Sequence, residues 1–183
     1  MHEREHAWAV YAQAERLYSA EEVEHALDRM AEEVTGALAD RDPVLLCVMT
    51  GGVVPAGKLL PRLDFPLQLD YIHATRYRGE VRGGVLHWMA RPALPLRERV
   101  VLLIDDILDE GHTIVGIEQY CLAEGARAVY TAILIDKRHQ RKVPGARADF
   151  LGLEVDDRYV FGYGMDYRGY LRNAPGIFAV TGG

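Results

Sequence analysis

VLLIDDILDEGHTI, residues 101–114, joins a buried strand, a dense group of acids and the start of a helix. The apolar run Val100–Ile104 is followed by four carboxylates within six positions, and then by Gly111, His112 and Thr113. An apolar helical pattern resumes after Thr113. In open α/β sheets, ligands bind beyond the carboxyl ends of strands, where the N-termini of the following helices point. The segment therefore predicts an α/β fold and also the position of its binding site.

The residues of this segment favour a sugar phosphate as the ligand. Backbone amides and the helix dipole would bind a phosphate at the turn, where Gly111 permits close backbone approach and Thr113 offers a hydroxyl. The acids would repel that phosphate, but adjacent carboxylates can accept hydrogen bonds from the vicinal hydroxyls of a ribose. We therefore expect the ribose at Asp105 and Asp106. The alternative interpretation, an acidic loop that only caps a helix, needs one acid and not four.

Strands and helices alternate along most of the chain, which predicts a mostly parallel twisted sheet flanked by helices. Residues 76–84 are polar and glycine-rich, as is typical of a mobile loop. Strands are expected at residues 44–49, 67–74, 85–90, 99–105 and 129–135, and helices at 53–63 and 113–124.

The first 42 residues predict an N-terminal helical layer on a single domain of residues 1–183. Apolar residues recur at helical spacing over residues 4–18 and again after Ser19. Ser19 and Glu22 form the pattern of a capping box at the start of the second helix. We expect this layer to pack on the rest of the domain or on a partner subunit.

Charge and composition narrow the classes of partner. The net charge is −6, with −7 in the first 42 residues and +1 in the rest, which argues against binding of nucleic acid by bulk electrostatics. No apolar run approaches the ~20 residues that cross a bilayer, so no membrane partner is expected. Cys47 and Cys121 lie in apolar stretches without metal-ligand spacing, and no signal peptide is evident. These features predict a cytoplasmic protein with reduced cysteines.

IDDILDEGHT, residues 104–113, resembles the phosphoribosyl-diphosphate signature of type I phosphoribosyltransferases. No P-loop and no GxGxxG after a strand competes with it. The resemblance covers most of residues 44–180 and is closest to the hypoxanthine-guanine branch. It implies the type I fold with a small hood, and conversion of hypoxanthine or guanine plus phosphoribosyl diphosphate to IMP or GMP plus pyrophosphate. It also implies Mg²⁺ as cofactor and a homodimer or homotetramer.

The resemblance implies a role for each motif residue. Asp109 would handle the proton at purine N7, and Lys137, in LIDKR (134–138), would bind the 6-oxo group. The ribose and 5′-phosphate would contact Asp105, Asp106, Glu110, Gly111, His112 and Thr113. The other purine contacts would be Tyr159, Val160 and Met165, within or beside the motif YVFGYGMDYRGYLR (159–172). Pyrophosphate would contact Thr50, Gly51 and Gly52 of VMTGG (48–52), Arg76 and Tyr77 of YIHATRYRGE (71–80), and Arg172. The metal ligands would be Asp166, Asp105 and Asp106.

Two departures and several alternatives accompany this interpretation. Thr50 stands where lysine is common in the family, and Arg76 replaces the serine of a common Ser-Tyr pair. The family often has a cis peptide at the position of Met49–Thr50. The alternatives are a non-catalytic regulator that senses phosphoribosyl diphosphate on the same fold, and a transferase for another base such as xanthine. The sequence does not rank the purines, and His112 is either a phosphate donor or a solvent-facing side chain.

Overall fold

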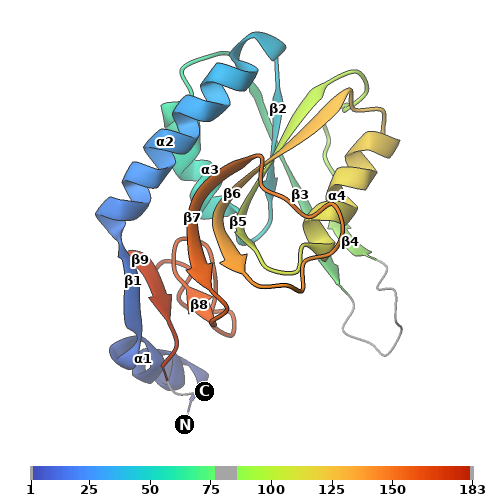
Figure 1. The fold of residues 1–183 in the computed structure, drawn as a ribbon. Helices are drawn as coiled ribbons and strands as arrows, with labels where there is room; N and C mark the ends of the chain where they lie inside the picture. The colour runs from blue at the N-terminus through green and yellow to red at the C-terminus, as the bar shows by residue number, and fades with distance from the viewer. Residues whose placement is uncertain (1, 77–85, 182–183) are drawn as a thin grey trace.

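The computed structural model describes residues 2–76 and 86–181, and its centre is a six-stranded sheet (Figure 1). The strands lie in the order β4-β3-β2-β5-β6-β7. Their bounds are β2 Val44–Val48, β3 Gln68–Arg76, β4 Leu86–Ala90, β5 Val100–Leu108, β6 Ala128–Arg138 and β7 Phe150–Asp156. All neighbouring pairs are parallel except β3 and β4, which are antiparallel. The predicted α/β class with a mostly parallel sheet is confirmed.

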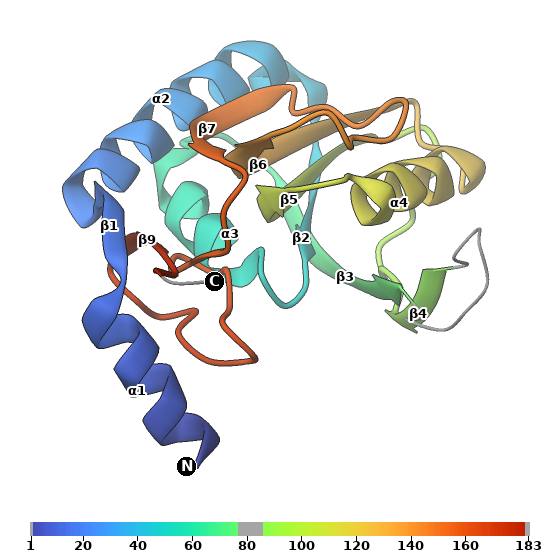
Figure 2. The same ribbon diagram turned by 60° about the horizontal axis from the view of Figure 1, so that its bottom comes forward.

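Helices cover both faces of this sheet. α2 (Ala20–Leu38) and α3 (Val53–Leu59) lie on one face, and α4 (His112–Ala123) lies on the other (Figure 2). The short 3-10 turns η1 (Ala39–Arg41) and η2 (Leu60–Arg62) follow α2 and α3. Because both faces are covered, all of β2 and the first five residues of β5 are buried. This burial explains why both strands are unbroken apolar runs in the sequence.

The start of α2 follows the predicted capping box. The Glu22 amide donates to Ser19 Oγ at 3.2 Å, and the Ser19 amide donates to Glu22 Oε2 at 2.8 Å. These bonds satisfy two amides that a helix N-terminus otherwise leaves unpaired. The apolar face of α2 is buried, and it comprises Val23, Ala26, Leu27, Met30, Ala31, Val34 and Leu38.

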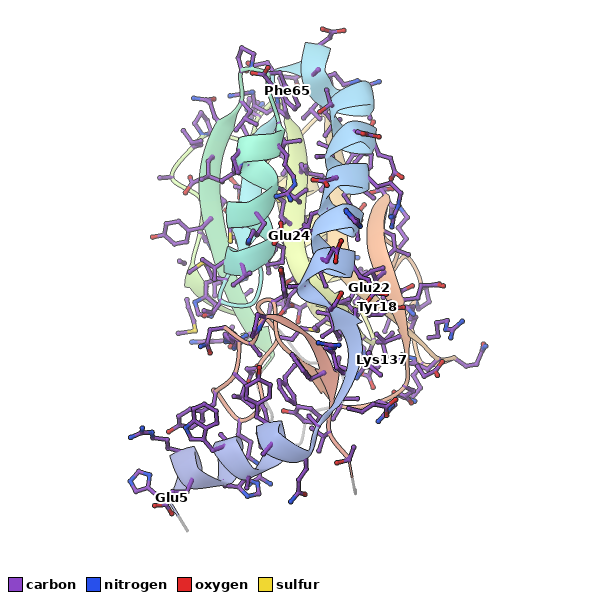
Figure 3. The ribbon with its side chains drawn as sticks, turned by 90° about the vertical axis from the view of Figure 1, so that its left-hand side faces the viewer. Glu5, Tyr18, Glu22, Glu24, Phe65 and Lys137 are labelled. Carbon is purple, nitrogen blue, oxygen red and sulfur yellow. The ribbon has the colours of Figure 1, made fainter. Side chains whose placement is uncertain are left out.

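Glu24 is a charged residue of α2 that faces α3 (Figure 3). Its carboxylate accepts hydrogen bonds or ion-pair contacts from Lys58 Nζ at 2.7 Å, Arg62 Nη2 at 2.6 Å and the Tyr163 hydroxyl at 2.8 Å. Burial alone would raise the pKa of Glu24, but these contacts outweigh it and lower the pKa to about 2. Glu24 therefore links α2, the α3–η2 segment and the loop after β8.

A small second sheet forms the hood. Its strands are β1 (Glu15–Ser19), β9 (Gly176–Ala179) and β8 (Val160–Phe161), in that order and all antiparallel. α1 (Glu3–Gln13) packs beside it, with the Tyr11 ring edge-on to Phe161 and Phe178. Segments near the two ends of the chain therefore lie side by side in the hood, where β1 pairs with β9 (Figure 1).

The structure differs from the local predictions at several places. The single helix expected over residues 4–18 is wrong, because α1 ends at Gln13 and residues 15–19 pair with β9. β5 continues through the acids to Leu108 and does not end at Asp105, because it pairs with β6 along that length. β7, β8 and β9 were not predicted. The loop expected at 76–84 lies almost entirely outside the described residues. No helix in the described ranges has the length and apolarity to cross a bilayer.

Candidate active site

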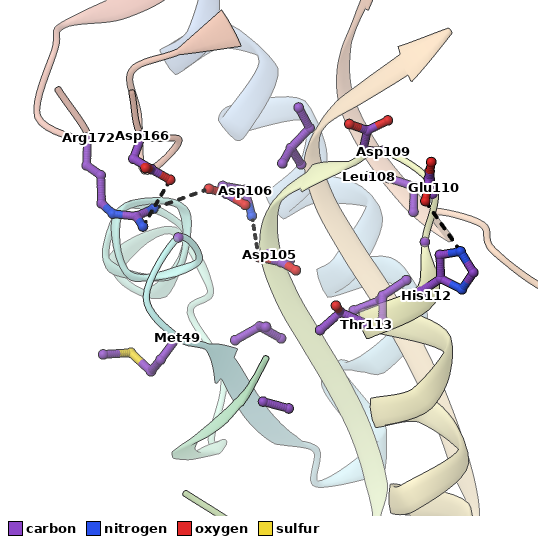
Figure 4. A pocket seen from close by; sticks show the side chains of 16 residues that line it. Met49, Asp105, Asp106, Leu108, Asp109, Glu110, His112, Thr113, Asp166 and Arg172 are labelled. Atoms are coloured by element: carbon purple, nitrogen blue, oxygen red, sulfur yellow. Dashed lines mark hydrogen bonds and ion pairs between the residues drawn. The ribbon is translucent and has the colours of Figure 1, made fainter. Parts of the chain in front are cut away.

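A cavity of about 410 Å³ lies beyond the carboxyl ends of β2 and β5, beside the N-terminus of α4 (Figure 4). The acid-rich segment and the turn before α4 form one wall, and side chains from the hood form another. The lining residues are Val48, Met49, Gly51, Ala74, Asp105, Asp106, Ile107, Leu108, Asp109, Glu110, Gly111, His112, Thr113, Ile114, Asp166 and Arg172. The cavity therefore occupies the place at which the sequence predicts a ligand.

Asp105 and Asp106 form a closely held acid pair in this cavity. Asp106 is buried, Asp105 is half-buried, and the Asp106 amide donates to Asp105 Oδ1 at 2.9 Å. Burial, followed by the charge of Asp106, raises the pKa of Asp105 well above its ordinary value. Burial also raises the pKa of Asp106, although the nearby Arg172 opposes the shift. The pair therefore favours a ligand that supplies hydrogen-bond donors or positive charge.

Arg172 connects this pair to Asp166 across the cavity. Arg172 Nη2 lies 3.1 Å from Asp166 Oδ1, and Nη1 lies 4.0 Å from Asp106 Oδ2 (Figure 4). Nη1 also donates to the carbonyl oxygen of Gly164 at 2.6 Å, and the Gly169 amide donates to Asp166 Oδ2 at 2.7 Å. Arg172 and Asp166 come from the loop after β8, so the hood supplies one charged side of the cavity.

The loop after β2 approaches the acid pair closely. A Cβ atom on Gly51 would overlap the Asp106 carboxylate, so a side chain there would force the loop or the acid to move. The peptide bond Met49–Thr50 is cis, as the family resemblance implies. The Gly52 amide donates to the carbonyl oxygen of Val48 at 2.8 Å, and Thr50 is exposed. Of the three predicted pyrophosphate contacts in this loop, the structure therefore brings Gly51 to the cavity wall.

The turn before α4 has the conformation that the glycine predicts. Gly111 has a φ of 86°, in the left-handed region, and α4 begins at the next residue. A side chain at Gly111 would also overlap Ala146. His112 Nε2 lies 3.4 Å from Glu110 Oε2, so these two side chains lie together at the rim (Figure 4). Residues 110–113 all line the cavity and present the positive end of the α4 dipole to it.

Asp109 lies between two donors from the end of β6. Lys137 Nζ is 2.8 Å from Asp109 Oδ2, and His139 Nε2 is 2.6 Å from Oδ1. Burial alone would raise the pKa of Asp109, but the hydrogen bonds from Lys137 and His139 outweigh it and lower the pKa. Asp109 is thus an ionised carboxylate whose two oxygens are both held at the cavity wall.

The remaining predicted purine contacts belong to the hood. Tyr159 is 52% exposed, and its ring is edge-on to Tyr167 at 5.4 Å between centroids. Val160 and Met165 are buried. These three residues are not part of the cavity lining given above. Arg76 is the last residue of β3, but its side chain lies outside the described part of the chain, as does Tyr77.

Two groups of acids are candidates for holding a metal ion. Asp105, Asp106 and Asp166 present carboxylate oxygens to one cavity, and hard oxygen ligands are those that Mg²⁺ prefers. Asp109, His139 and Asp157 also lie within reach of one another. However, Asp109 is paired with Lys137, and Asp157 is paired in two-pronged fashion with Arg141 at 2.6 and 2.9 Å. Cations of the chain therefore contact both groups, since Arg172 pairs with Asp166 and lies 4.0 Å from Asp106, and Asp105 is the acid of the first group that Arg172 does not pair with.

The contact between His139 and Asp109 was not predicted from the sequence. Lys137 and His139 are two positions apart at the end of a strand, which places their side chains on the same side. That alternation was the available signal, although it does not reveal that the side faces Asp109.

Known proteins share both the sequence pattern and the fold. Residues 13–168 match the phosphoribosyl transferase domain. The chain belongs to the phosphoribosyltransferase family. A hypoxanthine-guanine-xanthine phosphoribosyltransferase of Tritrichomonas foetus is 32% identical over 161 residues, which cover 88% of each chain. A hypoxanthine-guanine phosphoribosyltransferase of Aquifex aeolicus is 28% identical, covering 90% of this chain and 93% of the relative.

Solved structures place this phosphoribosyltransferase in the same fold. A hypoxanthine phosphoribosyltransferase from Staphylococcus aureus superposes with a TM-score of 0.85 at 25% identity, covering 91% of this chain and 90% of that one. The expected type I phosphoribosyltransferase fold is therefore confirmed. The matched region begins at residue 13, so it leaves out almost all of α1.

Proposed function

We propose that this phosphoribosyltransferase is a purine salvage enzyme that converts hypoxanthine or guanine and phosphoribosyl diphosphate to IMP or GMP and pyrophosphate. The names of the relatives support this assignment. The main structural support for this function is that three features lie at one wall of the cavity. They are the acid pair, the glycine turn before α4, and Asp109 in contact with Lys137.

The sugar phosphate would lie along the β5–α4 corner. Asp105 and Asp106 would accept hydrogen bonds from the ribose hydroxyls, which supply the donors that a buried acid pair needs. The 5′-phosphate would lie on the backbone of the turn formed by Glu110, Gly111, His112 and Thr113. Gly111 allows the close approach and Thr113 adds a hydroxyl.

The leaving pyrophosphate would lie on the opposite side, between Gly51 and Arg172. The bond from the anomeric carbon to pyrophosphate breaks as the bond to purine N9 forms, so negative charge grows on the leaving group. Arg172 would stabilise that charge, with Thr50, Gly52, Arg76 and Tyr77 as further proposed contacts. Mg²⁺ bound to carboxylate oxygens of Asp105, Asp106 and Asp166 would supply further neutralisation of the diphosphate.

The purine would lie between Lys137 and the hood. Lys137 would donate to the 6-oxo group, and an adenine amino group could not accept that hydrogen bond. Asp109 would accept the proton of N7, for which its lowered pKa keeps it ionised at neutral pH. Tyr159 would stack on the base, Val160 would bind it through the main chain, and Met165 would face the purine 2-position.

A spectrophotometric assay tests the assignment. Hypoxanthine, guanine, xanthine and adenine are each incubated with the protein, phosphoribosyl diphosphate and Mg²⁺, and nucleotide formation is followed. We expect turnover of hypoxanthine or guanine, and none of adenine. Xanthine turnover would extend the substrate class, as the name of the Tritrichomonas foetus relative suggests. Binding of phosphoribosyl diphosphate without turnover of any base would favour the non-catalytic regulator.

We further propose that the enzyme forms a homodimer or homotetramer, acts in the cytoplasm and uses small molecules rather than nucleic acid or membranes as partners. Residues 1–183 would act as one domain, with residues 1–42 packed on it.

An apolar groove of about 490 Å³ lies beside α3 and is a candidate contact between subunits. Val53, Leu69 and Tyr71 are 45–52% exposed there. Exposed apolar clusters of this kind favour contact between subunits. Light scattering should give twice or four times the chain mass, and a monomer would contradict this part.

A further inference from the structure

His139 makes the shorter of the two contacts to Asp109. Its Nε2 atom is 2.6 Å from Asp109 Oδ1, whereas Lys137 Nζ is 2.8 Å from Oδ2. The intervening Arg138 points the other way, because it pairs with Asp156 at 2.7 Å. Lys137, near the end of β6, and His139, just after the strand, therefore donate to the two oxygens of one carboxylate, while Arg138 points elsewhere.

The loop after β6 fixes the tautomer of this imidazole. The Arg141 amide donates to His139 Nδ1 at 3.0 Å, so Nδ1 carries a lone pair and the ring proton is on Nε2. The side chain of His139 is only 4% exposed, and Arg141 is itself held by both oxygens of Asp157. His139 is thus a pre-oriented donor aimed at Asp109 Oδ1.

If Lys137 binds a purine, its contact with Asp109 changes, whereas the contact from His139 does not. When Lys137 turns toward the 6-oxo group, its three N–H donors are shared between the purine and Asp109 Oδ2, so it holds the carboxylate less firmly during the reaction. An aspartate carboxylate rotates through a broad range about its last torsion angle unless a partner fixes it. Asp109 is 44% exposed, so packing alone does not fix it. His139 can stay in place, since its ring is buried and the Arg141 amide holds its other nitrogen.

We propose that His139 is a positioning residue that keeps Asp109 Oδ1 bound when Lys137 turns toward the purine, so that Oδ2 faces the proton on N7. The proton then moves from N7 to Oδ2, and Oδ1 still accepts the hydrogen bond from His139. This role rests on the proposed function, because that function assigns the proton transfer to Asp109. The contact between His139 and Asp109 does not depend on it.

The experiment compares His139→Ala with His139→Gln, whose amide can donate from nearly the same place as Nε2. His25→Ala, at an exposed position on α2, is the matched control for a lost imidazole. Circular dichroism and melting temperature establish that each variant is folded. The charged groups around the site include Lys137, Arg141, Asp157 and Glu110, which lies 4.0 Å from Arg141, and all four stay unchanged.

We expect His139→Ala to lower kcat by about 10- to 100-fold, the range for losing a hydrogen bond to a charged group. KM for phosphoribosyl diphosphate should stay within about threefold, because His139 does not line the sugar side of the cavity. The acid limb of the profile of kcat/KM against pH should move to higher pH, because Asp109 loses a contact that lowers its pKa. His139→Gln should restore most of the rate and of the profile, and His25→Ala should match the wild type.

A measurement without substrate separates the two proposals. The pKa of Asp109 is followed by carboxyl ¹³C NMR in the free protein, and it should rise in His139→Ala but not in His139→Gln. Wild-type turnover together with an unchanged pKa and pH profile in His139→Ala would overturn the positioning role. If the wild type turned over no purine while the pKa rose as expected, the proposed function and the catalytic part of the inference would fail, but the contact would stand.

Discussion

Asp109 combines three properties that suit a proton acceptor: a lowered pKa, partial exposure to the cavity, and a neighbouring lysine. Asp109→Asn keeps the size and the hydrogen-bonding shape of the side chain but removes its basicity. We expect kcat to fall by about 10²- to 10⁴-fold, with KM for both substrates much less changed. Steady-state kinetics with hypoxanthine measure both values. A rate near that of the wild type would remove Asp109 from the proton transfer.

Single residues were predictable from the sequence where a motif names them. The acid pair, Gly111 and Lys137 reach one region because a signature and a strand end mark them. His139 was not predictable, because its function depends on a contact across 30 positions of the chain. No local pattern distinguishes an imidazole that faces a carboxylate from one that faces solvent.

The loop between β2 and α3 is an element whose backbone path is set by the acid pair beneath it. Gly51→Ala places a methyl group on the Asp106 carboxylate, so the loop or the acid must move. We expect at least a tenfold loss of affinity for phosphoribosyl diphosphate, the equivalent of about 1.4 kcal/mol, in a protein that still folds. Isothermal titration calorimetry with Mg²⁺ present measures this affinity.

Gly57→Ala is the matched control for that substitution. Gly57 lies on α3, and nothing stands within 4 Å of the position of its added Cβ. Alanine favours a helix over glycine by about 0.5–1 kcal/mol, so this variant should be slightly more stable and bind normally. Equal affinity in Gly51→Ala and the wild type would show that the close approach of this loop has no role in binding.

Strands that are buried on both faces were predicted well from the sequence. Strands whose partner lies far away along the chain were predicted poorly. β2 and the first part of β5 are apolar on both faces, so their sequences alone indicate central parallel strands. Residues 15–19 follow a helical spacing of apolar residues but form β1, because they find hydrogen-bond partners in β9 at the other end of the chain. The extension of β5 to Leu108 likewise depends on β6.

The whole molecule brings its two ends together to build the hood. β1 comes from the N-terminal segment and β9 from the last residues, and β8 carries Val160 beside them. The proposed purine contacts Tyr159, Val160 and Met165 therefore depend on a sheet built from segments far apart in the sequence, whereas Lys137 belongs to the main sheet. A charged link made by Glu24 then joins the hood to the helices on the main sheet.

The pH dependence of stability should report this link. The folded pKa of Glu24 is about 2, below its ordinary value of 4.5, so its ionised contacts stabilise the fold fully above pH 4.5. That contribution is lost as the pH falls from 4.5 through 2, because protonation removes the charge that Lys58 and Arg62 bind. We expect Glu24→Gln to lower the free energy of unfolding by about 2 kcal/mol at pH 7, and the difference from the wild type to shrink toward zero near pH 2.

Urea unfolding followed by circular dichroism measures this free energy at each pH. Glu32→Gln, at an exposed position on the same helix, is the control. A difference that is the same at every pH would mean that Glu24 acts through packing, and that its charge does not tie the hood to the helices.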